Sequence, residues 1–146
     1  MDASSSRVLV VDDDEVVRRS YARSLATSAC SVDAVDNGEA ALRRMQQDVF
    51  DVVLLDLRMP GMDGLAVLRI LKRDWPDSEV IVITGYPALD SAKQAVALGA
   101  YDYLAKPTEP RELVRVTTSA AQHKRWALHR ERRPAVRTDF FEGEAS

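Results

Sequence analysis

Acidic, hydroxyl and amine side chains follow short apolar runs at four separate places in the sequence. They are Asp12 and Asp13 after Val8–Val11, Asp56 after Val52–Leu55, Thr84 after Val80–Ile83, and Lys106 two residues after Tyr101–Leu104. Carboxylates that crowd together repel one another unless a cation neutralises them. Oxygen ligands without His or Cys suit Mg²⁺, which accepts one or two carboxylates and leaves room for a phosphate. The pattern therefore predicts phosphate chemistry at a Mg²⁺ site, if the fold brings the four places together.

Each side chain has a role once a phosphate is present. Asp56 is a candidate nucleophile, because a carboxylate is ionised at neutral pH and can form an acyl phosphate. Lys106 can pair with a phosphoryl oxygen as a point charge, and Thr84 can donate its hydroxyl to another. Taken singly, these residues also fit ordinary structural roles: an acid after a strand is more often a helix cap, as we expect for Asp14. It is the combination that favours a site.

The elements that must position these residues follow from the hydrophobic pattern. Aliphatic runs without polar alternation are typical of strands buried on both faces, as in a parallel sheet, whereas the mixed runs 31–35 and 101–104 predict edge strands. Apolar residues at helical spacing lie between them: Val17/Tyr21/Leu25, a short helix opened by Asn37-Gly38-Glu39 and ending at Met45, Leu65/Leu68/Leu71, Leu89/Ala92/Val96/Gly99 and Leu113/Val116/Ala120. Five strands alternating with five helices predict an α/β fold with an open parallel sheet that is doubly wound. Ligands of such sheets bind beyond the carboxyl ends of the strands, where the candidate residues lie.

The overall composition limits the class of protein. The chain has 146 residues, 46% of them hydrophobic, and a net charge of −3. These values predict one globular domain in which neither a nucleic-acid-binding surface nor an acidic disordered tail dominates. The single cysteine, Cys30, excludes an intrachain disulfide and a multi-cysteine metal site. The longest aliphatic runs have four residues, so we expect no signal peptide, no membrane contact and a cytoplasmic location.

The four places together resemble the receiver domain of bacterial two-component response regulators. The matching segments are Val8–Asp14, Leu54–Gly64, Ile83–Gly85 and Tyr103–Pro107, which occur in the family's order and with suitable spacing. The likeness covers about residues 7 to 122, and residues 83–107 are particularly similar to receivers of the nitrogen-regulator, enhancer-binding type. It implies a flavodoxin-like sheet of order 2-1-3-4-5.

The resemblance also implies a role for each matching residue. Asp56 corresponds to the phosphoacceptor, which receives its phosphoryl group from a histidine kinase or a phosphotransfer protein. Asp12, Asp13, Asp56 and the backbone carbonyl of Arg58 correspond to the ligands of Mg²⁺, for which Mn²⁺ can substitute. Three consecutive aspartates leave open which two bind the metal, and the family pattern favours Asp12 and Asp13. Thr84 and Lys106 match the phosphate-sensing pair, Tyr103 matches the switch aromatic, and the Lys106–Pro107 peptide bond is commonly cis.

We expect a phosphate on Asp56 to shift the domain between two conformational states. Thr84 and Lys106 would move toward the phosphate, Tyr103 would rotate into the space that Thr84 vacates, and the surface of the fourth helix, fifth strand and fifth helix would change. Without the resemblance, Tyr103 is equally well explained as an edge-strand tyrosine packed on a helix. We further expect Arg58 and Tyr86 to flank the path of the hydrolytic water and to set the lifetime of the phosphate.

The end of the sequence has a different composition. A helix can continue through Glu131 until Pro134 ends it, and residues 124–133 hold five basic residues and one acid. This run is either a solvated helix face or part of a linker helix that pairs with its twin through Leu113, Val116, Ala120 and Ala127. The alternative surface for a homodimer is that of the fourth helix, fifth strand and fifth helix. Because no reading motif accompanies the basic run, we expect no direct nucleic-acid binding by this chain. The expected division is residues 1–6 disordered, 7–122 receiver, 123–133 helix extension and 134–146 flexible tail.

Three classes of function are compatible with these residues. We expect a signalling switch that catalyses only its own phosphorylation and dephosphorylation. A Mg²⁺-dependent phosphohydrolase is an alternative, but Arg58 stands where haloacid-dehalogenase-like phosphatases carry an acid/base aspartate. A phosphorylation-independent interaction module is disfavoured because Asp13, Asp56, Thr84 and Lys106 are all present.

Overall fold

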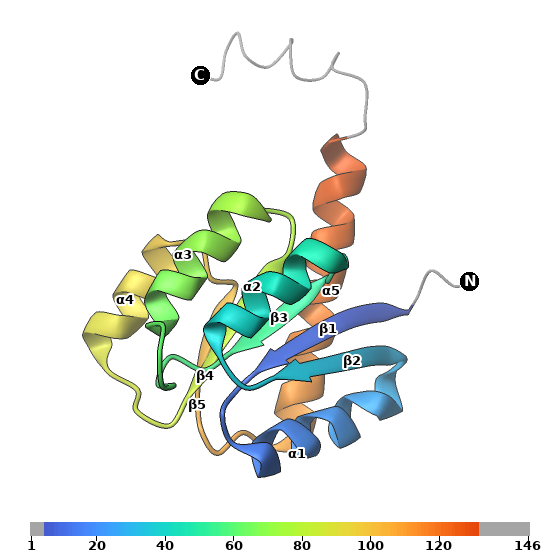
Figure 1. Cartoon of the computed structure of the whole chain (residues 1–146). Helices are drawn as coiled ribbons and strands as arrows, with labels where there is room; N and C mark the ends of the chain where they lie inside the picture. The colour runs from blue at the N-terminus through green and yellow to red at the C-terminus, as the bar shows by residue number, and fades with distance from the viewer. Residues whose placement is uncertain (1–4, 132–146) are drawn as a thin grey trace, which may run out of the picture.

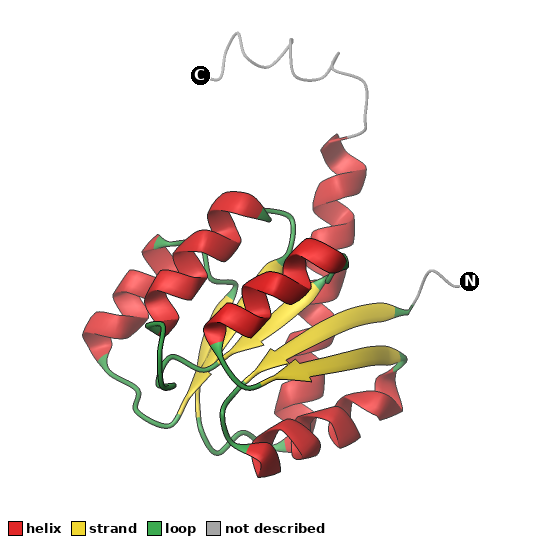
Figure 2. Cartoon of the chain, viewed as in Figure 1, coloured by secondary structure: helices red, strands yellow, loops and turns green. Residues whose placement is uncertain are grey.

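A five-stranded parallel sheet forms the centre of the molecule (Figures 1 and 2). The computed structural model of the chain describes residues 5–131, with side chains described through Lys124. The strands are β1 (Ser6–Val11), β2 (Cys30–Val35), β3 (Val52–Leu55), β4 (Glu79–Thr84) and β5 (Asp102–Ala105). Their order is β2-β1-β3-β4-β5, which confirms the predicted fold class, strand order and edge strands.

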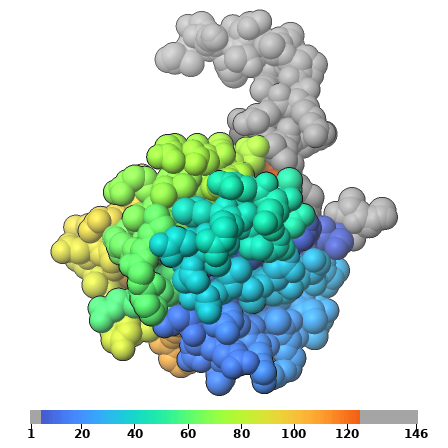
Figure 3. All heavy atoms as spheres, viewed as in Figure 1, coloured from blue at the N-terminus to red at the C-terminus, as the bar shows by residue number. Residues whose placement is uncertain are grey.

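Helices cover both faces of this sheet (Figure 1). They are α1 (Glu15–Leu25), α2 (Gly38–Gln47), α3 (Gly64–Asp74), α4 (Leu89–Ala97) and α5 (Pro110–Glu131), and a 3₁₀ turn, η2 (Ala26–Ser28), follows α1. One core lies between the sheet and α2, α3 and α4, and a second lies between the sheet and α1 and α5. In the space-filling view, α2 and α3 close over the first of these faces (Figure 3).

Alternate residues of each central strand enter the two cores. Leu9 and Val11 of β1 pack under α2 and α3, whereas Val8 and Val10 pack against α1 and α5. All four are fully buried, and burial of each such side chain contributes about 1.5–3 kcal/mol. This two-sided burial explains why the central strands carry aliphatic residues at every position and hold their carboxyl ends rigidly.

Polar caps begin two of the helices at the expected residues. The Asp14 carboxylate accepts the backbone N–H of Val16 at 2.9 Å, and the Asn37 side chain accepts that of Ala40 at 2.8 Å. Such bonds satisfy amide groups that have no partner within the helix. Asp14 is therefore occupied in starting α1, as its position before Glu15 predicted.

The predicted buried face of the fourth helix is wrong, although the helix itself is present. Leu89 and Val96 are 71% and 64% exposed, and the fully buried residue of α4 is Ala95. The helix packs beside β5, an edge strand of four residues that covers only a narrow line of it. A small alanine therefore faces the sheet, and the larger apolar side chains face outward.

The predicted dimer seam on the fifth helix is also wrong for the residues that the structure describes. Leu113, Val116 and Ala120 are at most 2% exposed and pack in the core between α5 and the sheet. Their heptad-like spacing arises because one face of α5 is buried within its own domain. The side chain of Ala127 lies outside the described residues, as do residues 132 and 133 of the predicted extension; the helix itself continues to Glu131.

The chain ends meet the predicted division only in part. Strand β1 begins at Ser6, which pairs with Cys30 and is 5% exposed, so at least this residue of the segment expected to be disordered is ordered. Residues 1–4 and the predicted tail, 134–146, lie outside the described residues.

Candidate functional site

The two central strands place their acidic residues side by side at the carboxyl edge of the sheet. The backbone N–H of Asp12 donates to the carbonyl of Val35 at 3.2 Å, and that of Asp56 donates to the carbonyl of Val11 at 3.0 Å. The sheet ladder thus continues one residue beyond β1 and β3. Because backbone hydrogen bonds hold both residues, their side chains emerge from fixed positions.

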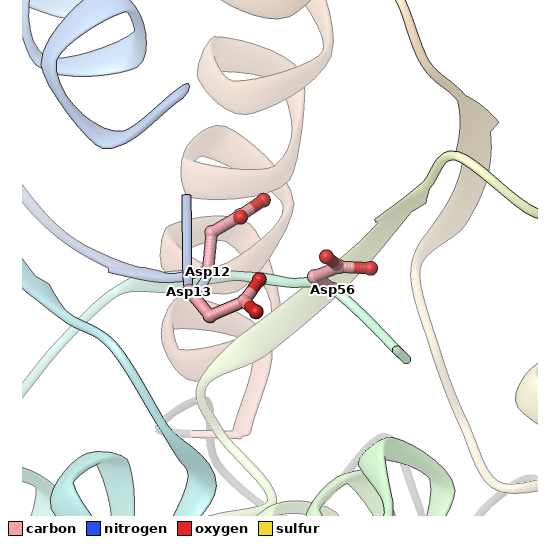
Figure 4. A group of neighbouring side chains, drawn as sticks. All are labelled: Asp12, Asp13 and Asp56. Atoms are coloured by element: carbon pink, nitrogen blue, oxygen red, sulfur yellow. The ribbon is translucent and has the colours of Figure 1, made fainter. Parts of the chain in front are cut away.

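Three carboxylates gather at this edge (Figure 4). Asp12, Asp13 and Asp56 each offer one oxygen, and these oxygens all lie within 4.8 Å of one another. Asp12 is 2% exposed and Asp56 is 5% exposed, whereas Asp13 is exposed. The cluster is therefore buried on one side and open to a solvent-borne ligand on the other.

The Lys106 ammonium lies between the two buried carboxylates. Its Nζ donates to Asp12 Oδ2 at 2.7 Å and to Asp56 Oδ2 at 3.1 Å. Its backbone N–H donates to the carbonyl of Thr84 at 2.8 Å, and the Lys106–Pro107 peptide bond is cis, as the resemblance implied. The structure thus brings together residues that are 94 and 50 positions apart in the sequence.

Burial and charge shift the pKa values of this group. Burial raises the pKa of Asp12, and the Asp56 charge adds to that shift, although the hydrogen bond and charge of Lys106 and the N–H of Asp14 oppose it. Burial lowers the pKa of Lys106, but its hydrogen bonds and the charges of Asp12 and Asp56 outweigh that effect and raise it overall. One ammonium faces three carboxylates, so the site favours an additional cation.

The donor set fits Mg²⁺. All three ligand groups are carboxylates, and the exposure of Asp13 suits a cation that keeps several of its waters. The Arg58 backbone lies beside the cluster, because its N–H donates to Asp56 Oδ1 at 3.2 Å. The residues present can therefore hold a hard divalent cation.

Thr84 is at the site, whereas Tyr103 is directed toward α4. Thr84 is fully buried, and its hydroxyl accepts the backbone N–H of Tyr86 at 3.1 Å. The Tyr103 hydroxyl lies 2.7 Å from Ser91 Oγ and accepts the N–H of Ala88 at 3.4 Å. Tyr103 therefore connects β5 to the start of α4, and β4 lies between it and the strand that ends before Asp56.

Arg58 and Tyr86, each two residues after a residue of the site, contact each other. The Arg58 guanidinium carbon lies 4.1 Å from the centre of the Tyr86 ring, within range of a cation–π interaction. Both side chains are exposed, and Tyr86 is 64% exposed. Their backbone N–H groups donate to Asp56 Oδ1 and Thr84 Oγ1, so the pair joins the two loops that follow β3 and β4.

Two further residues support the site: Arg18, which had no distinguishing feature in the sequence, and Gly64, which ends the matching segment Leu54–Gly64. Arg18 Nη1 donates to the Asp12 carbonyl at 2.8 Å, which ties α1 to the acidic loop. Gly64 lies so close to the preceding loop that a Cβ there would come within 2.4 Å of Leu57 Cα. Only glycine at this position therefore lets α3 begin so close to Leu57, the residue after the phosphoacceptor candidate.

Comparison with known proteins agrees with this geometry. The sequence model of the family described as the response regulator receiver domain matches residues 8–118. The chain belongs to this family. The transcriptional regulator NtrC of Escherichia coli K12 is 40% identical over 116 residues, and the regulator FleR of Pseudomonas aeruginosa is 38% identical over 110 residues. These relatives confirm the resemblance to regulators of the NtrC type.

Solved structures show the same receiver fold. A CheY-like receiver domain protein from Methanospirillum hungatei superposes with a TM-score of 0.82 at 26% identity, covering 85% of this chain and 99% of that one. The structure of NtrX from Brucella abortus gives a TM-score of 0.79 at 29% identity, covering 87% of this receiver and 29% of NtrX.

The relatives of this receiver are much longer proteins. The match covers 80% of this chain but 25% of NtrC, and 75% of this chain but 23% of FleR. The expectation of no nucleic-acid binding is not borne out, because NtrC is named a DNA-binding transcriptional regulator. The lack of a reading motif within 146 residues says little about proteins about three times as long. No helix within residues 5–131 is long and apolar enough to span a bilayer.

Proposed function

We propose that Asp56 accepts a phosphoryl group from a phosphohistidine of a kinase or phosphotransfer protein, in a Mg²⁺-dependent reaction in the cytoplasm. The observation that carries this proposal is the Lys106 ammonium between Asp12 and Asp56, within a cluster of three carboxylates. An ammonium and a cation site beside a half-shielded carboxylate supply what a phosphoryl transfer to that carboxylate requires.

The transfer itself needs no general base. An Asp56 oxygen attacks phosphorus, the O–P bond forms, and the P–N bond breaks as the imidazole nitrogen retains the electron pair. When bound by Asp12, Asp13, Asp56 and the Arg58 carbonyl, Mg²⁺ (or Mn²⁺ in its place) offsets the charge on the phosphoryl oxygens. Lys106, already 3.1 Å from Asp56, pairs with one of those oxygens.

The phosphate then changes the hydrogen bonds of the Thr84 and Tyr103 hydroxyl groups, which in the unphosphorylated structure contact Tyr86 and Ser91. Turning the buried Thr84 hydroxyl toward it breaks the bond with the Tyr86 N–H, and rotation of Tyr103 breaks the contact with Ser91. Both exchanges change the start of α4. The exposed Leu89 and Val96 on that helix then belong to the changed α4-β5-α5 surface, through which homodimerisation or control of an output would follow.

An apolar groove beside the site offers a docking place for the phosphodonor. It has a volume of about 400 Å³ and lies between α1 and the loop after β5. Its lining includes Val16, Val17, Tyr21 and Pro107, together with Lys106 of the site itself. Val16 is 75% exposed, a large value for an aliphatic side chain next to a reactive centre.

We further propose that Arg58 and Tyr86 set the lifetime of the phosphate. Arg58 and Tyr86 follow Asp56 and Thr84, the two residues expected to contact the phosphate, and their side chains stack on each other. The stacked pair therefore restricts the approach of water to the phosphate. We also propose that residues 7–122 act as the receiver and residues 123–133 as a linker helix.

Intact-mass spectrometry tests the central proposal. Wild type incubated with acetyl phosphate and Mg²⁺ should gain one phosphate, and it should gain none when EDTA removes the metal. Asp56→Asn should abolish the gain, and Asp63→Asn, on an exposed loop residue, should leave it unchanged. Equal phosphorylation of Asp56→Asn and wild type would refute the assignment.

A further inference from the structure

A cluster of polar side chains lies at the amino ends of β3 and β4, opposite the phosphoacceptor candidate. Its carboxylates are Asp51, directly before β3, and Glu79, the first residue of β4. Its other members are His123 and Lys124 of α5, and Lys72 of α3, whose Nζ lies 3.9 Å from Glu79 Oε1. At the far ends of the same two strands stand Asp56 and Thr84. The proposed signalling chemistry makes no use of this cluster.

The first contact joins Lys124 to Asp51. Lys124 Nζ lies 2.9 Å from Asp51 Oδ1, and the lysine is only 7% exposed. The other oxygen of Asp51 accepts the backbone N–H of Arg7 at 2.8 Å, and its carbonyl accepts that of Glu79 at 3.0 Å. Asp51 thus connects β1, β3 and β4 to α5.

The second contact joins His123 to Glu79. His123 Nδ1 lies 2.6 Å from Glu79 Oε2, and the histidine ring packs at 5.4 Å from the ring of Tyr101. The Tyr101 hydroxyl in turn lies 2.7 Å from Ser119 Oγ on α5. Adjacent residues of α5 are therefore held at the amino ends of two neighbouring strands, by Asp51 before β3 and by Glu79 of β4.

These contacts come where α5 leaves the sheet. Ala120 and Ala121 are its last residues in the described core, and the helix continues beyond Lys124 to Glu131 (Figure 1). A buried ammonium without its carboxylate is strongly unfavourable and is relieved when the side chain reaches water. The end of α5 can reach water by separating from the sheet, which exposes the small side chains of Ala120 and Ala121 and leaves Leu113 and Val116 in the core.

We propose that the Asp51–Lys124 ion pair and the Glu79–His123 contact form a clamp that fixes the direction in which α5 leaves the domain. With the clamp closed, the helix end is held by the strands that carry Asp56 and Thr84. With the clamp open, α5 separates from the sheet from about Ser119 onward while the carboxylate site stays intact. The clamp is a property of the fold and does not depend on the proposed phosphorylation.

Hydrogen exchange of the full chain, followed by mass spectrometry, tests the clamp. Asp51→Asn keeps an acceptor for the Arg7 N–H but removes the charge opposite Lys124. We expect amides of residues 119–131 to exchange at least tenfold faster in this variant, with β1 and residues 110–118 unchanged. The double variant D51N/K124M should return to within about threefold of wild type, because methionine fills the space of the lysine without its charge.

The controls separate the clamp from a general loss of stability. Asp74→Asn removes an exposed ion pair with Arg73 and should leave α5 exchange unchanged. Unaltered exchange of residues 119–131 in Asp51→Asn would overturn the proposal, as would equal acceleration in β1 or failure of Lys124→Met to restore protection. If Asp51→Asn does not fold, Glu79→Gln tests the second contact, with faster exchange expected and no change overturning the clamp. Acetyl phosphate labelling of the same samples reports on the phosphoacceptor separately.

Discussion

Replacing Lys106 with methionine should strengthen Mg²⁺ binding while weakening the metal-free fold. The ammonium now occupies one oxygen of Asp12 and one of Asp56, so a cation must compete with it for both carboxylates. Methionine has a similar length and no charge. It removes the competitor and leaves the acidic ligands in place.

The size of the effect follows from the contacts that are lost. A hydrogen bond to a charged group is worth about 1.5–3 kcal/mol, and each 1.4 kcal/mol corresponds to about tenfold in affinity. Relief of one such bond in Lys106→Met should therefore tighten Mg²⁺ binding about tenfold. Two carboxylates within 4.8 Å of each other repel by about 3 kcal/mol at an effective dielectric constant of ~20, so the metal-free variant should lose stability of that order.

Calorimetric titration with Mg²⁺ and thermal unfolding with and without Mg²⁺ measure both effects. Lys93→Met, the same change at an exposed lysine of α4, is the matched control and should alter neither value. Unchanged or weaker Mg²⁺ binding by Lys106→Met would show that the lysine does not compete with the metal. It would remove the argument that three carboxylates and one ammonium form a cation site.

The remaining predictions concern the groups around this centre. In metal-free buffer, Asp12→Asn should raise the unfolding free energy at pH 7 by about 1 kcal/mol, since single changes have effects of this order. The folded-state pKa of Asp12 is raised above 3.8, so ionisation of Asp12 destabilises the wild type as the pH increases from 3.8 through that pKa. Unfolding free energies measured across this range should therefore show a smaller difference between Asp12→Asn and wild type at acid pH than at pH 7. Val16→Asp should slow phosphorylation by a histidine kinase tenfold or more and leave acetyl phosphate labelling unchanged; equal slowing by both donors would argue against the docking groove. Arg58→Ala and Tyr86→Ala should each shorten the phosphate half-life several-fold, and the double variant should be little faster than either, because the stacked pair acts as a unit; unchanged half-lives would refute their role.

The sequence was sufficient for the sheet and for the residues at its carboxyl edge. Parallel strands buried on both faces need apolar residues throughout, so their ends are sharply marked by the first charged residue. Asp12 and Asp56 are such residues, and once the strands are parallel and adjacent their meeting is a consequence of topology. The helix cap at Asp14 was predictable for a similarly local reason.

Surface packing was less predictable than the sheet. The periodicity of Leu89 and Val96 identified a helix but not which of its faces meets the sheet, because a short edge strand covers little of α4. The spacing of Leu113 and Val116 fits a seam between helices as well as a buried face. Apolar spacing shows that a face is covered but does not show by what.

Contacts between distant residues account for the rest of what the sequence left open. A role for Lys106 at the site was predictable, but its hydrogen bonds to Asp12 and Asp56 were not. The Asp51–Lys124 pair joins a loop to a helix 73 residues away and had no signal in the sequence. Ion pairs carry no periodicity and little local preference, so only the fold identifies them.

The carboxylate cluster couples stability to function in one direction. Burial of Asp12 and Asp56 costs free energy, which Lys106 offsets only in part, since three carboxylates share one ammonium. A domain selected for stability alone would replace these acids. Because they are present, the free-energy cost of burying them falls on the residues where a cation and a phosphate would bind. Variants that relieve the repulsion should therefore gain thermal stability, and those that gain most should lose most Mg²⁺ affinity. Lys106→Met should show the reverse, with lower stability and higher Mg²⁺ affinity. A series in which stability and affinity rise together would contradict this coupling.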